Sequence, residues 1–245
     1  MSNHLSLRSG NPVLTKKTFS NAIAHEDQMT IEGTVNKTAI SLLILVGAGY
    51  LTFDVINPIV LIGSGIGGFV LALVTMFKKE WSPITVPIYA AMEGTMLGGI
   101  SYMYNSLYDG IVTNAILLTV GILVSLLMAY KSGYIKATEN FKLGIFAATG
   151  GIAIVYLVNF IMGFFGSGLG VMSVNNASPL SIGFSIVVVI IASLNLVLDF
   201  DFIEEGAEKG APKYMEWFGA FGLLVTLIWL YLEILRLLAK LNSRK

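Results

Sequence analysis

Cysteine is absent from this chain of 245 residues, and histidine occurs only twice, at His4 and His25. Without cysteine there are no disulfides, thiolate metal sites or cysteine nucleophiles. Both histidines precede the first apolar segment, so none is available within a membrane for a rhomboid-like serine protease or for haem ligation. The sequence also lacks an HExxH zinc motif and a Walker-type phosphate loop. We therefore expect no enzymatic activity and no bound cofactor.

Charged residues are scarce as well, because only 12% of the chain is Asp, Glu, Lys or Arg. The 15 basic and 15 acidic residues cancel, so no net positive field is present to attract nucleic acid. Hydrophobic residues make up 55% of the chain, and most of them follow Thr34 in apolar segments. Segments of about 20 apolar residues span a bilayer as helices. The sequence therefore predicts an all-α, polytopic integral membrane protein whose first partner is the lipid bilayer.

Seven such segments follow one another, which predicts a bundle of seven transmembrane helices. The pair Asn57-Pro58 separates the first two, polar or glycine-containing connections separate the others, and Pro83 and Pro179 fit the first turns of helices. We expect the spans at residues 36–54, 57–77, 83–104, 110–130, 142–166, 178–199 and 217–241. The chain is thereby divided into a polar tail (1–35), a transmembrane domain (36–241) and a short C-terminal tail (242–245).

The distribution of lysine and arginine predicts the orientation. Basic residues precede the first span and occupy the connections after the second, fourth and sixth spans, whereas the other connections have none. Because cytoplasmic loops are enriched in these residues, we expect the N-terminus in the cytoplasm. Four basic residues at the other end then lie outside, namely Arg236, Lys240, Arg244 and Lys245. We favour seven complete crossings over the alternative that the last segment does not fully cross.

Three acidic residues are candidates for a functional site. Glu93 lies inside the third predicted span, Glu233 lies inside the last one, and Asp199 closes the sixth. An acid near the centre of a spanning helix costs about 2.5–3.5 kcal/mol, so it needs a partner, water or a proton. For Glu93 the alternative is a protonated or hydrogen-bonded structural carboxyl, and for Glu233 it is a static ion pair with Arg236. On position alone, Asp199 is a solvated helix end.

Polar side chains of the last two spans recur at helical spacing. In the last span, one stripe contains Gly219, Gly222, Thr226, Trp229, Glu233 and Arg236. In the sixth span, Asn195 and Asp199 share a face, and Asp201 opens an acidic connection (201–213) that we expect to be a solvated loop. We expect the two faces to meet around a polar axis to which Glu93 contributes. A weaker alternative for the acids of this connection is that they raise the local cation concentration at a pore mouth.

Two segments carry a resemblance to a known family: residues 198–203 (LDFDFI) and residues 230–235 (LYLEIL). Together with residues 11–14 (NPVL) and 29–34 (MTIEGT), they resemble the bacterial branch of the Bax inhibitor-motif transmembrane family. The resemblance implies a bacterial cytoplasmic membrane, a pH-dependent calcium leak in some members and regulation of a membrane protease in another. In calcium-leak members, an aspartate ending helix six pairs with an aspartate in the final Leu-Tyr-Leu-acid motif. Those positions match Asp199 and Glu233, and Lys37 is the nearest substitute for the arginine that contacts the pair.

We therefore predict a pH-sensitive leak channel or exchanger for calcium or other cations. A proton-linked Asp199–Glu233 pair would bridge the sixth and seventh helices as its gate. Calcium would bind transiently near Asp199 and Asp201. The leading alternative is a non-transporting protein that binds another membrane protein, such as a protease, or acts in a stress response. A small-solute transporter is a third, weaker alternative, since no inverted repeat is visible.

Overall fold

The computed structural model describes residues 28–55 and 57–244, and this part of the chain is helical. Its seven long helices are α2 (Ile31–Leu51), α3 (Pro58–Phe77), α4 (Ser82–Leu107), α5 (Ile111–Lys131), α6 (Glu139–Phe164), α7 (Pro179–Glu208) and α8 (Met215–Asn242). Two short 3₁₀ helices, η2 (Lys79–Trp81) and η3 (Gly170–Met172), lie in connections. The all-α prediction is confirmed for the described residues.

Six of these seven helices are long and apolar enough to cross a membrane. The exception is α4, which is long but interrupts its apolar residues with Glu93, glycines, hydroxyl residues and tyrosines. A membrane-embedded helical bundle is therefore supported, while the seventh crossing and the cytoplasmic N-terminus remain predictions. Residues 1–27 of the predicted polar tail (1–35) lie outside the described residues.

Two helix boundaries differ most from the sequence prediction. Helix α2 begins at Ile31 rather than at 36, because Thr30 caps it by accepting a hydrogen bond from the Gly33 amide. Helix α7 continues to Glu208, so the acidic connection predicted as a loop from 201 to 213 is mostly helix. The prediction was wrong there because hydropathy detects the membrane crossing and does not detect a helix that projects beyond it.

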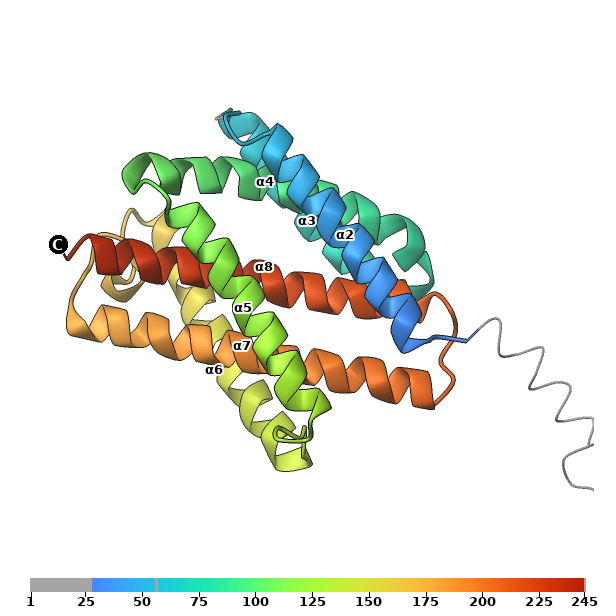
Figure 1. The fold of residues 1–245 in the computed structure, drawn as a ribbon. Helices are drawn as coiled ribbons and strands as arrows, with labels where there is room; N and C mark the ends of the chain where they lie inside the picture. Colours follow the sequence, from blue (N-terminus) through green and yellow to red (C-terminus); the bar gives the residue numbers. More distant parts are fainter. Residues whose placement is uncertain (1–27, 56, 245) are drawn as a thin grey trace, which may run out of the picture.

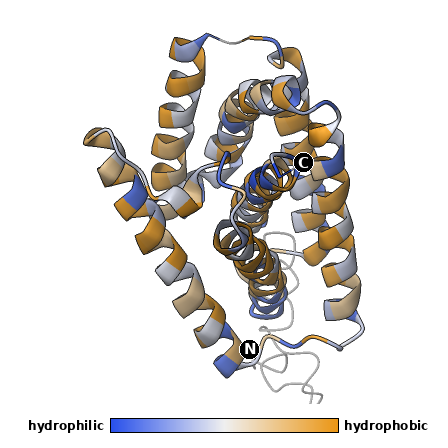
Figure 2. Cartoon of the chain, turned by 90° about the vertical axis from the view of Figure 1, so that its left-hand side faces the viewer, coloured by the Kyte–Doolittle hydropathy of each residue, from blue (hydrophilic) through white to orange (hydrophobic). Residues whose placement is uncertain are grey.

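Helix α8 is the central element of the bundle. It packs against α7, α2, α5 and α4, and Figure 1 shows it running through the middle of the molecule. Figure 2 looks along this helix and shows the other helices around it, with hydrophobic residues prominent on the outer ones. Its leucine-rich face, including Leu224, Leu227 and Leu230, is buried, and so are Gly219, Thr226 and Glu233. Side chains on α8 are therefore placed against several neighbouring helices at once.

Helices α2 and α4 approach each other closely through glycines. A Cβ atom added to Gly94 would lie 2.2 Å from the Leu45 carbonyl oxygen, and one added to Gly98 would lie 2.5 Å from the Gly49 carbonyl oxygen. Small residues allow this backbone contact between membrane helices. The contact fixes α4 on the bundle and thereby fixes Glu93.

Candidate functional site

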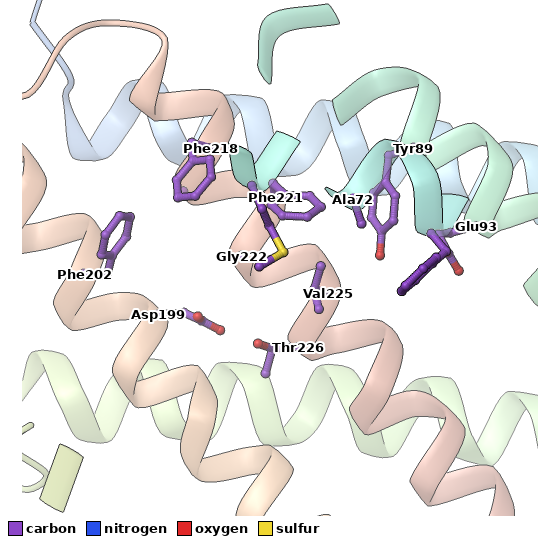
Figure 3. Close-up of a pocket in the computed structure, with 13 residues that line it drawn as sticks. Ala72, Tyr89, Glu93, Asp199, Phe202, Phe218, Phe221, Gly222, Val225 and Thr226 are labelled. Atoms are coloured by element: carbon purple, nitrogen blue, oxygen red, sulfur yellow. The ribbon is translucent and has the colours of Figure 1, made fainter. Parts of the chain in front are cut away.

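A cavity of about 530 Å³ lies between α3, α4, α7 and α8. Figure 3 shows its lining, in which Glu93 comes from α4, and Asp199 comes from α7. The remaining lining is mostly apolar and aromatic: Phe69, Ala72, Met76, Tyr89, Phe202, Phe218, Gly219, Phe221, Gly222, Val225 and Thr226. The bundle thus brings two of the predicted acids to one cavity.

Glu93 is held at this cavity by the packing of α3 on α4. Its residue exposure is 7%, and a Cβ atom added to Gly68 of α3 would lie 2.4 Å from its Oε1 atom. Gly68 therefore leaves the space that the carboxyl group occupies. No lysine or arginine nitrogen of the described residues lies within 4 Å of this carboxyl group. Glu93 is accordingly a buried acid without a basic partner in this part of the chain.

Asp199 reaches the same cavity from α7. Its Oδ1 atom would lie 3.5 Å from a Cβ atom added to Gly222, and its side chain faces Thr226 of α8 (Figure 3). Its Oδ2 atom is buried and has no hydrogen-bond partner among residues 28–55 and 57–244. A buried carboxylate oxygen without a donor is energetically costly. A proton or a cation in the cavity would relieve that cost.

Glu233 has different partners from those predicted. Tyr156 of α6 donates a hydrogen bond of 2.5 Å to Glu233 Oε1, and Arg236 Nη1 donates to Oε1 at 2.8 Å and to Oε2 at 3.0 Å. Arg236 Nη1 also lies 3.2 Å from the Tyr156 hydroxyl oxygen. The Glu233 side chain is only 2% exposed. This cluster of Tyr156, Glu233 and Arg236 is the ion pair that stood as the alternative for Glu233.

The predicted contact between Asp199 and Glu233 is therefore not formed in this structure. Asp199 faces Gly222 and Thr226, and Thr226 precedes Glu233 by seven residues on α8. Seven residues of helix correspond to about 10 Å along the axis. Asp199 faces the stripe of α8 that carries Glu233, as the spacing predicts. The antiparallel α7, however, places Asp199 two turns of helix away from Glu233.

The other residues of the predicted polar axis fasten helices together. The Asn195 amide donates to Thr149 Oγ1 of α6 at 2.9 Å and to the Ile191 carbonyl oxygen at 2.8 Å. Asp201 accepts from Lys142 of α6, with 2.7 Å between the charged atoms. Asp201 also lines a different cavity from Asp199, so the two do not form the shared calcium site that we expected. The residues predicted to form one polar axis are thus divided into separate side-chain clusters.

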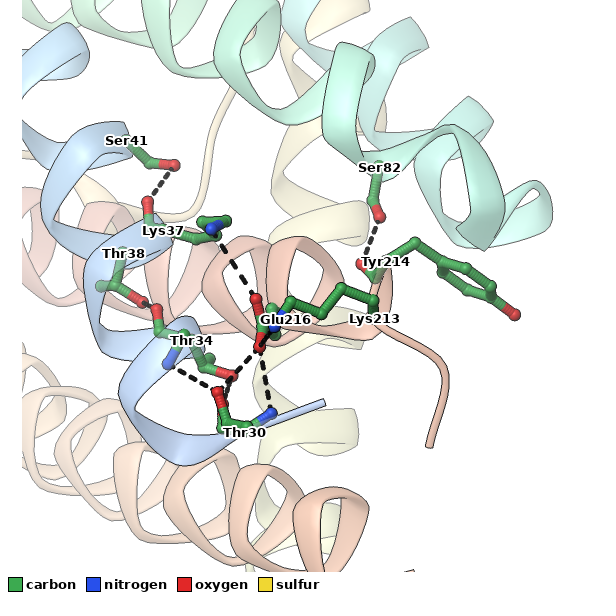
Figure 4. A network of polar contacts seen from close by, with 10 residues as sticks. Thr30, Thr34, Lys37, Thr38, Ser41, Ser82, Lys213, Tyr214 and Glu216 are labelled. Atoms are coloured by element: carbon green, nitrogen blue, oxygen red, sulfur yellow. Dashed lines mark hydrogen bonds and ion pairs between the residues drawn. The ribbon is translucent and has the colours of Figure 1, made fainter. Parts of the chain in front are cut away.

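A buried polar network that the sequence did not indicate surrounds Glu216 at the start of α8 (Figure 4). Glu216 is fully buried and accepts hydrogen bonds from Thr30 N at 3.1 Å and Thr30 Oγ1 at 2.9 Å. Lys37 and Lys213 lie 3.7 and 3.3 Å from its carboxylate oxygens. Lys37 therefore pairs with Glu216 and not with the predicted gate. Glu216 precedes the last predicted span by one residue, so its position in the sequence indicated an exposed interface.

Lys240 was also placed at a helix end by the sequence, yet it is fully buried. Its Nζ atom donates to the Val171 carbonyl oxygen at 2.6 Å, the Ser181 carbonyl oxygen at 3.2 Å and Ser185 Oγ at 2.9 Å. These three acceptors match the three donors of an ammonium group. Lys240 thereby joins the end of α8 to the start of α7 and to η3.

The geometry defines a helical membrane protein with buried acidic and basic groups on its central helix. No group of three or more potential metal ligands occurs among the described residues. The family model described as "Bax inhibitor 1 like" matches residues 11–243. The chain belongs to this family, and membership suggests a membrane role of the cation channel or transporter type. No curated protein matches the chain.

Proposed function

We propose that this protein is a pH-sensitive leak pathway for calcium or related cations and that its cation-binding chamber is the cavity between Glu93 and Asp199. The observation that carries the proposal is the presence of two buried carboxyl groups, from α4 and α7, at one cavity between α3, α4, α7 and α8. Neither has a basic residue within 4 Å among the described residues. Family membership supports the same class of function.

The chemistry of the chamber suits a hard cation. Calcium prefers oxygen ligands, which the two carboxylates and the Thr226 hydroxyl supply. Rings or pairs of acids select cations in channels, and binding must stay weak enough for release. Two carboxylates in a largely aromatic cavity, without a complete ligand cage, meet both requirements. We therefore propose transient occupancy during passage instead of a resident calcium ion.

The Tyr156–Glu233–Arg236 cluster offers a barrier beyond the chamber. It lies two turns of α8 past Thr226, and the fully buried Lys240 follows one turn later. A cation leaving the chamber in this direction meets Arg236 and Lys240, and fixed positive charges repel cations in pores. We propose that the present arrangement is closed and that conduction requires α8 to move the Arg236 side chain aside.

The sequence prediction assigned proton sensing to the pair of Asp199 and Glu233. We propose instead that Asp199 acts with Glu93. Protonation neutralises either carboxyl group and removes its attraction for a cation, while ionisation leaves a buried charge that favours water or a cation in the cavity. The pH dependence of the leak is thus tied to the chamber. Replacing Asp199 with the neutral isostere asparagine should flatten the dependence of calcium flux on pH.

Calcium flux into dye-loaded vesicles that contain the purified protein tests the proposal. We expect Glu93→Gln combined with Asp199→Asn to reduce the flux at least tenfold, because both charges that attract the cation are lost. The matched control is Glu80→Gln, which neutralises an exposed acid outside the chamber and should leave the flux unchanged. Equal flux and equal pH dependence in all three proteins would contradict the proposal. Absence of flux from the unaltered protein would favour the interaction-protein alternative.

A further inference from the structure

A second cavity, on the other side of α8, has a different chemistry. It is a groove of about 330 Å³ between α2, α4, α5 and α8. Its size falls at the lower end of the range of about 300–1,000 Å³ found for small-molecule sites. The lining consists mainly of aliphatic side chains, and the buried Leu97, Leu227 and Ile228 form its floor. This groove is separate from the acidic chamber.

The groove opens sideways, between α2 and α5. Helix α2 packs on α4 and α8, while α5 packs on α7 and α8, so α2 and α5 are not packed against each other. In Figure 1, α8 is visible between α2 and α5. Wall residues at the opening are exposed: Val46 by 61%, Ile116 by 48% and Val120 by 51%. Because α2 and α5 are both candidate membrane spans, the opening faces the hydrocarbon of the bilayer.

The polar groups inside the groove already have partners. Ser101 Oγ and the Tyr231 hydroxyl are 2.6 Å apart, and Thr119 Oγ1 donates to the Ala115 carbonyl oxygen at 2.8 Å. Tyr50 also lines the groove, but it is 82% exposed at the opening. The lining includes no acidic or basic residue of the described chain. The interior therefore offers nothing to a polar or charged ligand and favours hydrocarbon.

We propose that this groove is a binding site for one acyl chain of a membrane phospholipid. An aliphatic chain entering sideways from the bilayer buries its surface against the floor without losing a hydrogen bond. A free fatty acid is disfavoured because no lysine or arginine lines the groove to hold its carboxylate. The bound chain lies against α8, the same helix that carries Thr226 and Glu233, so occupancy would restrain that helix.

A photoreactive phospholipid with a diazirine at the end of one acyl chain tests this site in vesicles that contain the full chain. Bulk lipid reaches the outer surface of the bundle, whereas only a chain inside the groove reaches the floor. We expect cross-links on Leu224, Leu227 and Ile228 of α8, which line the groove and are buried. Ile116→Trp on α5 and Val46→Trp on α2 fill the opening from opposite walls and should each lower this labelling several-fold.

Matched controls place the same bulky residue next to these positions, outside the groove. Leu117 and Leu43 are 66% and 73% exposed and do not line the groove, so Leu117→Trp and Leu43→Trp should leave the labelling unchanged. Equal labelling in all five proteins, or none on α8, would overturn the proposal. Stronger floor labelling by a photoreactive free fatty acid than by the phospholipid would overturn the assignment to phospholipid.

Discussion

At the residue scale, the role of Glu233 is set by its partners. A carboxylate this deeply buried is stable only while Arg236 and Tyr156 donate hydrogen bonds to it. The Arg236 guanidinium also lies over the Tyr156 ring, at 5.5 Å from its centroid. The cluster is therefore a charged structural contact between α6 and α8, and we assign it to the barrier instead of to proton sensing.

Arg236→Met tests this assignment, because it leaves the Glu233 carboxylate buried without a cation. We expect the free energy of unfolding to fall by about 3–5 kcal/mol, as for other buried ion pairs that lose one partner. Denaturant titration in mixed micelles provides the measurement. The double variant Arg236→Met/Glu233→Gln removes the unpaired charge and should recover a large part of the loss. A single variant as stable as the unaltered protein would contradict the assignment.

The sequence identified which residue types were unusual but not which of them meet. It placed Glu93 inside an apolar segment, where the structure buries it, and the spacing of residues in the last span placed Thr226 and Glu233 on one stripe. It did not indicate the offset of α7 relative to α8 along the helix axis. That offset depends on the α7–α8 connection and on side-chain packing, which spacing within one helix does not determine. Asp199 therefore faces Thr226 and not Glu233.

At the element scale, the start of α2 is tied to the start of α8. Met29 is 2% exposed, and its amide donates to the Ala211 carbonyl oxygen at 2.7 Å. Thr30 binds Glu216, and Gly33 lies so close that an added Cβ atom would be 2.0 Å from Glu216 Oε1. These contacts explain why α2 begins earlier than apolar content predicts, because a buried polar network orders its first turn.

Gly33→Ala measures how tightly this network is packed. The new methyl group collides with the Glu216 carboxylate, so we expect a loss of about 1–3 kcal/mol in unfolding free energy, as for other overpacked sites. Gly47→Ala is the control on the same helix, since nothing lies within 4 Å of its added Cβ atom. Alanine restricts the unfolded chain more than glycine, so the control should be neutral or stabilising by up to about 1 kcal/mol. Equal effects of the two changes on the free energy of unfolding would show that the side chains around Glu216 rearrange to accept the methyl group, which would contradict tight packing.

At the scale of the whole molecule, the length of the apolar segments predicted the helices well. Helix α4 shows that this criterion alone does not identify every long helix. This helix has 26 residues but contains many small and polar ones, which suit contact with α2, α3 and α8 better than contact with lipid. Apolar composition therefore identifies six of the seven long helices of the described residues, whereas a helix such as α4, which packs on several neighbours, is free to depart from it. The central position of α8 likewise follows from packing partners that only the folded bundle defines.

A single introduced cysteine tests most directly whether cations pass through the chamber between Glu93 and Asp199. Because the chain has no native cysteine, Val225→Cys introduces the only thiol, on the chamber wall. Ile154→Cys on α6 is the control, because residue 154 is exposed and does not line the chamber.

Calcium flux is then measured before and after a positively charged, membrane-impermeant thiosulfonate reagent is added. We expect Val225→Cys to react and to lose at least nine-tenths of its calcium flux, because a fixed cation then occupies the path, while Ile154→Cys keeps its flux. Complete labelling of Val225→Cys without any loss of calcium flux would contradict the account.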